Sequence, residues 1–183
     1  IVAQIENIPI DVNEFDRMLS ILPVWHIFER MFEMVAIISG CCTYYTSLRT
    51  LKDDMKLVKP TFMASAPRLW EKVFSGIYTN IEKSPRIKQV MFHAAYYLSQ
   101  NYNRAHRFIT GKELNTDGRN LLASGLRFFY EILVFISFFP ANKLFDAIVL
   151  KKIRAATGGQ LKGSVSGGGA LPMHVDLFFN NIG

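Results

Sequence analysis

A glycine run near the end of the chain is the pattern most suggestive of chemistry. The apolar stretch before it, Leu161–Ser166, is typical of a strand, and Met173–Ile182 is typical of a helix. Between them, Gly167, Gly168 and Gly169 would let the backbone approach a flat ligand or a phosphate, because no Cβ atoms intervene. The spacing fits neither the G-x-x-x-x-G-K-[ST] phosphate loop nor the G-x-G-x-x-G dinucleotide fingerprint. A tight strand-to-helix turn without a ligand is the alternative.

A second candidate is the segment Leu22–Arg30, LPVWHIFER, which follows a short apolar run typical of a strand. Open α/β sheets bind ligands beyond the carboxyl ends of their strands, so His26 is placed to line a site. A lone histidine beside Trp25 and Phe28 is nevertheless more often structural. No serine or cysteine partner is evident, so the sequence does not support a hydrolase triad.

The third candidate runs from Lys59-Pro60-Thr61 to Glu71 and again joins a strand to a helix. Pro67 suits the first turn of that helix. Arg68 is placed either to meet an anion or to pair with the nearby Glu71. Taken one at a time, none of the three candidates decides a function.

The elements that would position these residues alternate between strand and helix. We expect strands at Met18–Leu22, Cys41–Thr46 and Thr61–Ser65, and helices at Ile27–Ile38, at Leu51–Val58 and from Pro67 onward. The alternation predicts an α/β fold, with a mixed or parallel sheet flanked by helices. We expect a helical insertion over residues 84–155, whose loop carries the turn formers Gly111, Asn115, Asp117 and Gly118.

Composition narrows the classes of protein. With 183 residues, of which 50% are hydrophobic, the chain can bury one core of ordinary domain size. Its 21 Lys and Arg against 15 Asp and Glu give a net charge of +6, which would attract polyanions. The alternative, which the scattered basic residues favour, is that a piece of a longer protein shows a charge balance that the whole does not. The basic residues form no block, so we expect no nucleic-acid binding. Cys41 and Cys42 are neighbours, and adjacent cysteines bridge only with severe strain, so no disulfide is expected.

One apolar segment, Leu126–Leu150, raises the question of a membrane. Its most apolar part, Phe128–Phe139, is 12 residues long and contains Glu131, whereas a membrane span needs roughly 20 residues. Pro140 then interrupts it. We expect a buried helix hairpin here, with a membrane-surface patch as the alternative.

Together and in this order, the three candidates resemble segments of the long-chain fatty acyl-CoA synthetases, which belong to the adenylate-forming AMP-binding superfamily. LPVWHIFER is similar to the family's segment at the entrance of the acyl pocket, and VKPTFMASAPRLWEKV resembles one of its strand-helix units. SVSGGGALPMHV resembles the strand and glycine turn that border the adenine and the acyl channel. The resemblance covers nearly the whole chain, as an internal piece of the large N-terminal domain.

The resemblance implies a two-step ligase reaction that uses ATP, Mg²⁺ and CoA. The fatty acid carboxylate attacks the α-phosphate of ATP to give an acyl-adenylate and pyrophosphate, and the CoA thiol then displaces AMP. Matched onto this chain, the nucleotide site would consist of Gly167, Gly168, Gly169, Ala170, Leu171 and Pro172. The acyl pocket would include Trp25, His26 and Ser166. No catalytic residue and no metal ligand of the family matches a position in this chain.

The family's phosphate loop should precede Ile1, and its magnesium-holding glutamate and its mobile C-terminal domain should follow Gly183. We therefore expect this chain alone to make no acyl-adenylate. The implied partners are a long-chain fatty acid, ATP and CoA, in the cytoplasm, with peripheral contact to a membrane as a further option. The alternatives are a ligase for another carboxylic acid, and a non-catalytic helical module that docks on membranes through Leu126–Leu150.

Overall fold

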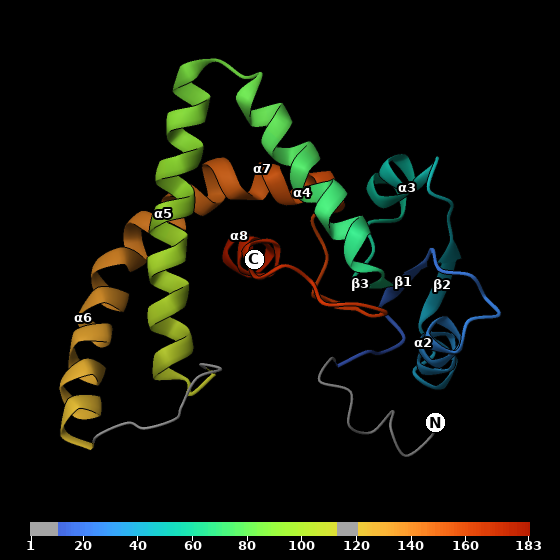
Figure 1. The fold of residues 1–183 in the computed structure, drawn as a ribbon, viewed down its shortest axis with the longest axis horizontal. Helices are drawn as coiled ribbons and strands as arrows, with labels where there is room; N and C mark the ends of the chain where they lie inside the picture. Colours follow the sequence, from blue (N-terminus) through green and yellow to red (C-terminus); the bar gives the residue numbers. More distant parts are fainter. Residues whose placement is uncertain (1–10, 113–120) are drawn as a thin grey trace. The chain divides into compact units, whose positions relative to one another are not determined.

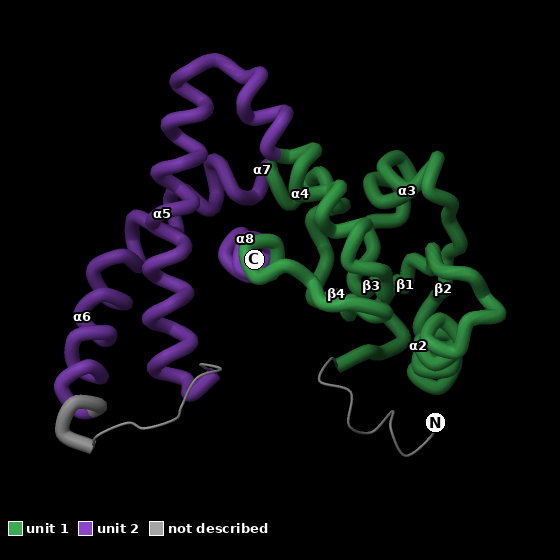
Figure 2. Tube along the Cα trace, in the orientation of Figure 1, with its two compact units in different colours: residues 1–77, 153–176 green, residues 78–152, 177–183 purple. Residues whose placement is uncertain are grey.

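A computed structural model describes residues 11–112 and 121–183 of the chain. The chain divides into two compact units, shown in different colours in Figure 2. Unit 1 consists of residues 1–77 and 153–176, and unit 2 consists of residues 78–152 and 177–183. The predicted insertion over residues 84–155 has somewhat different bounds from unit 2 and stays a prediction.

Four strands and the helices between them follow one another along the chain (Figure 1). The strands are β1 (Arg17–Ser20), β2 (Cys42–Tyr45), β3 (Phe62–Ser65) and β4 (Gly163–Ser166). The longer helices are α2 (Ile27–Ile38), α3 (Leu51–Val58), α4 (Pro67–Glu82), α5 (Arg86–Ile109), α6 (Leu121–Phe145) and α8 (Met173–Ile182). A π-helical turn (Asp146–Leu150), α7 (Lys151–Arg154) and a 3-10 turn (Ala155–Thr157) follow α6.

The sheet of unit 1 is parallel throughout, in the order β2-β1-β3-β4. Met18 of β1 lies opposite Thr43 on one side and Phe62 on the other, and Phe62 lies opposite Gly163 of β4. The predicted α/β class is therefore confirmed, with the parallel form of the two that the sequence left open. Strand β4 joins the sheet beside β3 although the whole of α5 and α6 separates them along the chain.

Both faces of the sheet are covered by helices. The connection from β1 through α2 to β2 runs in one direction along the sheet, and that from β2 through α3 to β3 runs in the other. Right-handed crossovers then place α2 and α3 on opposite faces. Successive residues of β1 and β3 accordingly alternate between two packed sides, and both strands are largely buried.

The core under α2 is built around aromatic rings. Phe32 is buried, and its ring lies 5.0 Å from that of Phe28 in an edge-on arrangement and 5.3 Å from that of Phe62. Met18 and Ala36 belong to the same buried cluster. Phe32 therefore joins the inner side of α2 to the centre of the sheet.

An ion pair connects the residues that directly precede β1 and β4. Nζ of Lys162, just before β4, lies 2.8 Å from Oδ1 of the buried Asp16, just before β1. Burial opposes ionisation of Asp16, but hydrogen bonds from Lys162 and Thr61 outweigh it and hold the pKa of that carboxyl below its usual value. Asp16 is therefore ionised at neutral pH, and its ion pair with Lys162 links the amino ends of β1 and β4.

Unit 2 is helical, and aromatic rings fill its interior. Helices α5 and α6 pack along each other. The ring of Tyr78 lies 5.7 Å from that of Phe92 and 5.5 Å from that of Phe178, and Tyr96 stacks 5.7 Å from Phe178. The buried Asn181 adds polar contacts, because its carbonyl oxygen accepts a hydrogen bond from Asn103 at 3.1 Å.

Two expectations about the segment Leu126–Leu150 are wrong. Helix α6 continues through Pro140 to Phe145, so the segment is no hairpin. Proline removes one helical hydrogen bond, but the helix continues through Pro140, which lies on an exposed side of α6. One face of α6 is also exposed rather than buried. The predicted turn formers Asn115, Asp117 and Gly118 lie outside the described residues.

Candidate functional site

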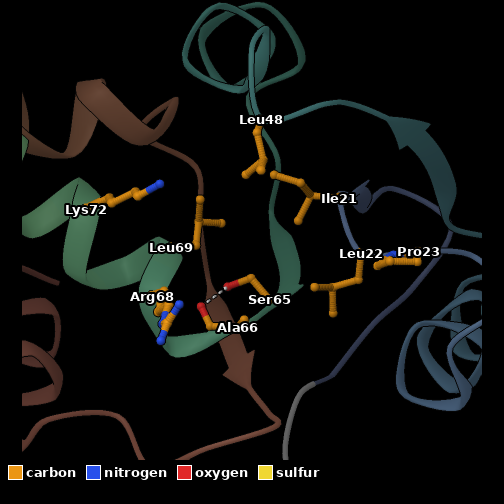
Figure 3. A pocket seen from close by; sticks show the side chains of 9 residues that line it. All are labelled: Ile21, Leu22, Pro23, Leu48, Ser65, Ala66, Arg68, Leu69 and Lys72. Carbon is orange, nitrogen blue, oxygen red and sulfur yellow. Dashed lines mark hydrogen bonds between the residues drawn. The ribbon is translucent and has the colours of Figure 1, made fainter.

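A cavity opens at the carboxyl edge of the sheet in unit 1, beyond the ends of β1 and β3 (Figure 3). Its volume is about 380 Å³, within the range of small-molecule sites. Six apolar residues, one serine and two cations of α4 line it: Ile21, Leu22, Pro23, Leu48, Ser65, Ala66, Arg68, Leu69 and Lys72. An apolar surface with cations at its border suits a ligand that has an apolar body and an anionic group.

The glycine turn after β4 adjoins the same edge. The N–H of Gly167 donates to the carbonyl of Ser65 at 3.0 Å, which extends the pairing of β3 and β4 beyond the strands. Since Ser65 also lines the cavity, this residue connects the cavity to the turn. A Cβ at Gly167 would overlap the ring of Phe28 in α2, and one at Gly169 would lie 3.7 Å from Cγ of Pro67 in α4. The three sequence candidates therefore meet at one edge of the sheet.

The turn leaves its own backbone accessible. Gly168 has a φ of +79°, which favours glycine, and no atom lies within 4 Å of a Cβ built there. Ala170 is exposed, and Leu171 and Pro172 are half-buried as the chain enters α8. The geometry fits the predicted nucleotide site, because a flat ring can approach backbone that no side chain covers. The assignment of these residues to a nucleotide stays a prediction.

The structure also places the residues predicted for the acyl pocket. Ser166 ends β4, and its Oγ is buried without a hydrogen-bond partner among the described residues. His26 caps α2, since its Nδ1 accepts a hydrogen bond from the N–H of Phe28 at 3.2 Å. The side chain of Trp25 is 81% exposed. None of these three residues lines the cavity, so their role in an acyl pocket also stays a prediction.

Sequence reasoning missed several residues of the cavity. Ile21 follows β1, Leu48 follows β2, and Lys72 lies one helical turn after Arg68. The four-residue spacing of Arg68 and Lys72 places both cations on one side of α4, and this spacing was visible in the sequence. Leu48 gave no such signal, because its place depends on where β2 lies in the sheet.

A buried carboxyl group lies close to this edge. Glu29, in the first turn of α2, is 0% exposed, and neither of its oxygens has a hydrogen bond of ordinary geometry from the described residues. Burial raises the pKa of Glu29, the charge of Glu33 raises it further, and the hydroxyl of Ser20 acts in the opposite direction. The structure thus contains a carboxyl group that resists ionisation.

We expect the Glu29→Gln variant to be more stable than the wild type at neutral pH. A carboxyl whose folded-state pKa is raised favours folding below its unfolded pKa, and that contribution is lost as the pH rises through the folded value. The gain should be on the order of 1 kcal/mol at pH 7 and should vanish below about pH 4. Urea unfolding across this pH range measures it, with the exposed Glu14→Gln as the control. A less stable variant at pH 7 would show that the carboxylate has a stabilising partner.

The described part of the chain contains no cluster of side chains typical of a metal site. Over residues 11–112 and 121–183, no group of three or more His, Cys, Asp or Glu side chains is arranged to hold a metal ion.

Comparison with known proteins identifies the family. The model of the AMP-binding enzyme family matches residues 1–183, the whole chain, so the chain belongs to the AMP-binding enzymes. A parallel sheet whose carboxyl edge carries an exposed glycine turn agrees with this membership. No solved structure matches the chain significantly.

The chain is similar to several curated acyl-activating enzymes and ligases. The chain is 34% identical over 96% of its length to the "Probable acyl-activating enzyme 16, chloroplastic" of Arabidopsis thaliana. It is 32% identical over 92% to a chloroplastic long-chain-fatty-acid–[acyl-carrier-protein] ligase of the same plant, and 28% identical over 93% to long-chain-fatty-acid–CoA ligase 1 of Saccharomyces cerevisiae. The chain spans only 24%, 23% and 21% of these three relatives.

Proposed function

We propose that the chain forms part of an ATP-dependent ligase that activates long-chain fatty acids as acyl-adenylates and passes the acyl group to the thiol of CoA. The observation that carries the proposal is the match of the AMP-binding family along all 183 residues. Similarity to relatives whose names include long-chain fatty acid ligases supports the substrate class. The apolar cavity beside the glycine turn supports it independently.

The residues of this chain would bind and orient the reactants. The backbone of Gly167–Pro172 would border the adenine of ATP, with Gly168 and Gly169 leaving room for the ring. Ile21, Leu48 and Leu69 would hold apolar parts of the acid. ATP supplies the activating adenylyl group when bound, while Mg²⁺ neutralises phosphate charge and would be held by residues outside those described.

Two cations that line the cavity would stabilise the negative charge of the fatty acid carboxylate or of the ATP phosphates. Arg68 and Lys72 lie one turn apart on α4 and both line the cavity. Electrostatic stabilisation of this kind acts strongly where apolar neighbours reduce access of water. We therefore assign to Arg68 a positioning role toward the anionic reactant.

Removing this cation should lower catalytic efficiency. We expect Arg68→Met in the complete protein to reduce kcat/KM for the fatty acid about 10-fold or more, because a hydrogen bond to a charged group is worth about 1.5–3 kcal/mol. Steady-state kinetics at saturating ATP measure the effect. The Lys56→Met variant, which removes an exposed cation from α3, should retain full activity. Equal activity of both variants would remove Arg68 from the site.

The identity of the thiol acceptor is a separate question. One relative is named as a ligase that uses acyl-carrier protein, so this carrier is a second candidate acceptor. The complete protein should be supplied with ATP and a panel of fatty acids, together with either CoA or acyl-carrier protein. Thioester formation with long-chain acids and CoA is the expected result. Thioester formation with acyl-carrier protein alone would change the acceptor, and products only from short or aromatic acids would refute the proposed substrate class.

A further inference from the structure

The exposed side of α6 presents an apolar stripe in unit 2. Its members are 58–77% exposed: Leu126, Phe129, Leu133, Ile136 and Leu144. Successive members lie three, four or eight residues apart, so they share one side of the helix. By length and composition, the stretch Gly125–Thr157 could cross a membrane, and only 6% of its most apolar window is buried. An apolar face of this extent on a folded unit is unusual without a partner.

The opposite side of α6 is packed and polar, which argues against a membrane-spanning helix. Phe135 stacks on Tyr102 of α5 with ring centroids 4.7 Å apart. The buried Glu131 pairs with Arg104 of α5 at 3.9 Å and with Arg127 at 3.7 Å. A helix with one exposed apolar side and an opposite side that carries a buried, ion-paired glutamate suits the plane of a membrane surface rather than its interior.

The net charge of unit 2 indicates which kind of surface the stripe binds. Unit 2 contains 11 Lys and Arg against 5 Asp and Glu, a net charge of +6, whereas unit 1 contains 10 of each. The whole net charge of the chain is therefore carried by the unit that exposes the stripe. Lys143 beside the stripe and Lys151 and Lys152 after it are exposed. Basic residues flanking an apolar helix face attract anionic lipid headgroups.

We propose that α6 docks in the plane of an anionic membrane surface through the stripe Leu126, Phe129, Leu133, Ile136 and Leu144, with α5 on the side facing water. The apolar side chains enter the boundary between headgroups and acyl chains, and the flanking lysines contact the headgroups. This inference does not depend on the ligase activity proposed above. A ligase for long-chain acids would nevertheless gain from a surface that holds its substrate.

Vesicle sedimentation of the complete protein tests the docking. Wild-type protein should bind vesicles of mixed phosphatidylcholine and phosphatidylglycerol. Leu133→Asp and Ile136→Asp should each weaken that binding about 10-fold, since the side chains leave the apolar boundary. The control is Leu57→Asp, a change of a more exposed leucine on α3 of unit 1, which should bind as the wild type does.

Two further measurements test the role of lipid charge and the folding of the variants. Wild-type binding should fall in pure phosphatidylcholine vesicles and at about 0.5 M salt, where charge attraction is largely screened. Circular dichroism should show that the aspartate variants stay folded, because both positions are exposed. Failure of the complete protein to bind anionic vesicles would overturn the inference and indicate that another part of the protein covers the stripe. Equal binding of the Leu133→Asp and Leu57→Asp variants would also overturn it.

Discussion

Replacing Phe32 with alanine is expected to lower the free energy of unfolding by about 3–5 kcal/mol, the usual cost of truncating a buried aromatic ring. The Phe32 ring contacts Phe28 and Phe62, so its loss would leave a cavity between α2 and the centre of the sheet. Because Phe28 also borders the glycine turn, we expect the loss to reach the site as well as the core. Urea unfolding of the chain, followed by circular dichroism, measures the effect.

The same helix provides a matched control. Ile37 of α2 is 70% exposed, so Ile37→Ala should change stability by less than about 0.5 kcal/mol. Comparable losses in the two variants would show that α2 does not pack on the sheet through Phe32.

Adding a side chain at Gly167 should have the largest effect on activity. A Cβ there would overlap the ring of Phe28, whose edge-on packing against Phe32 limits where the ring can move. We expect Gly167→Ala to cost about 1–3 kcal/mol of stability. Acyl-adenylate formation by the complete protein should fall by on the order of 100-fold, because small displacements of groups that position reactants are costly. Pyrophosphate release measures the second quantity.

Two companion variants identify the cause. Gly76→Ala changes an exposed glycine of α4, where a Cβ meets no atom within 4 Å, and should retain near-normal activity. Combining Gly167→Ala with Phe28→Ala should recover part of the stability that the Gly167 variant loses, since the two residues are coupled by contact. Additive losses in the double variant would show that overlap with the Phe28 ring is not the cause.

Local sequence signals predicted the helices of unit 1 closely. The helices Ile27–Ile38 and Leu51–Val58 begin and end where the sequence placed them, and so does Met173–Ile182. Residues within one or two turns determine such ends: His26 caps α2, and Pro60 follows α3. The strands differ from the prediction only at their ends, since an apolar run does not show where pairing stops.

Features that depend on residues far apart in the sequence could not be predicted in the same way. The position of β4 beside β3 depends on pairing between strands that the whole of α5 and α6 separates along the chain, so the strand order was not apparent. Leu48 enters the cavity only because β2 lies next to β1. The expectation that α6 is buried was wrong for a related reason. Apolar content predicts burial, but it does not specify which surface provides it.

We propose that this chain holds part of an acid-activating site at the carboxyl edge of its sheet. The most direct measurement is pyrophosphate release from ATP by the complete protein, with and without palmitate. We expect release that depends on palmitate and is largely lost in the Gly167→Ala variant. Palmitate-independent release, or no release by the folded protein with any fatty acid tested, would contradict it.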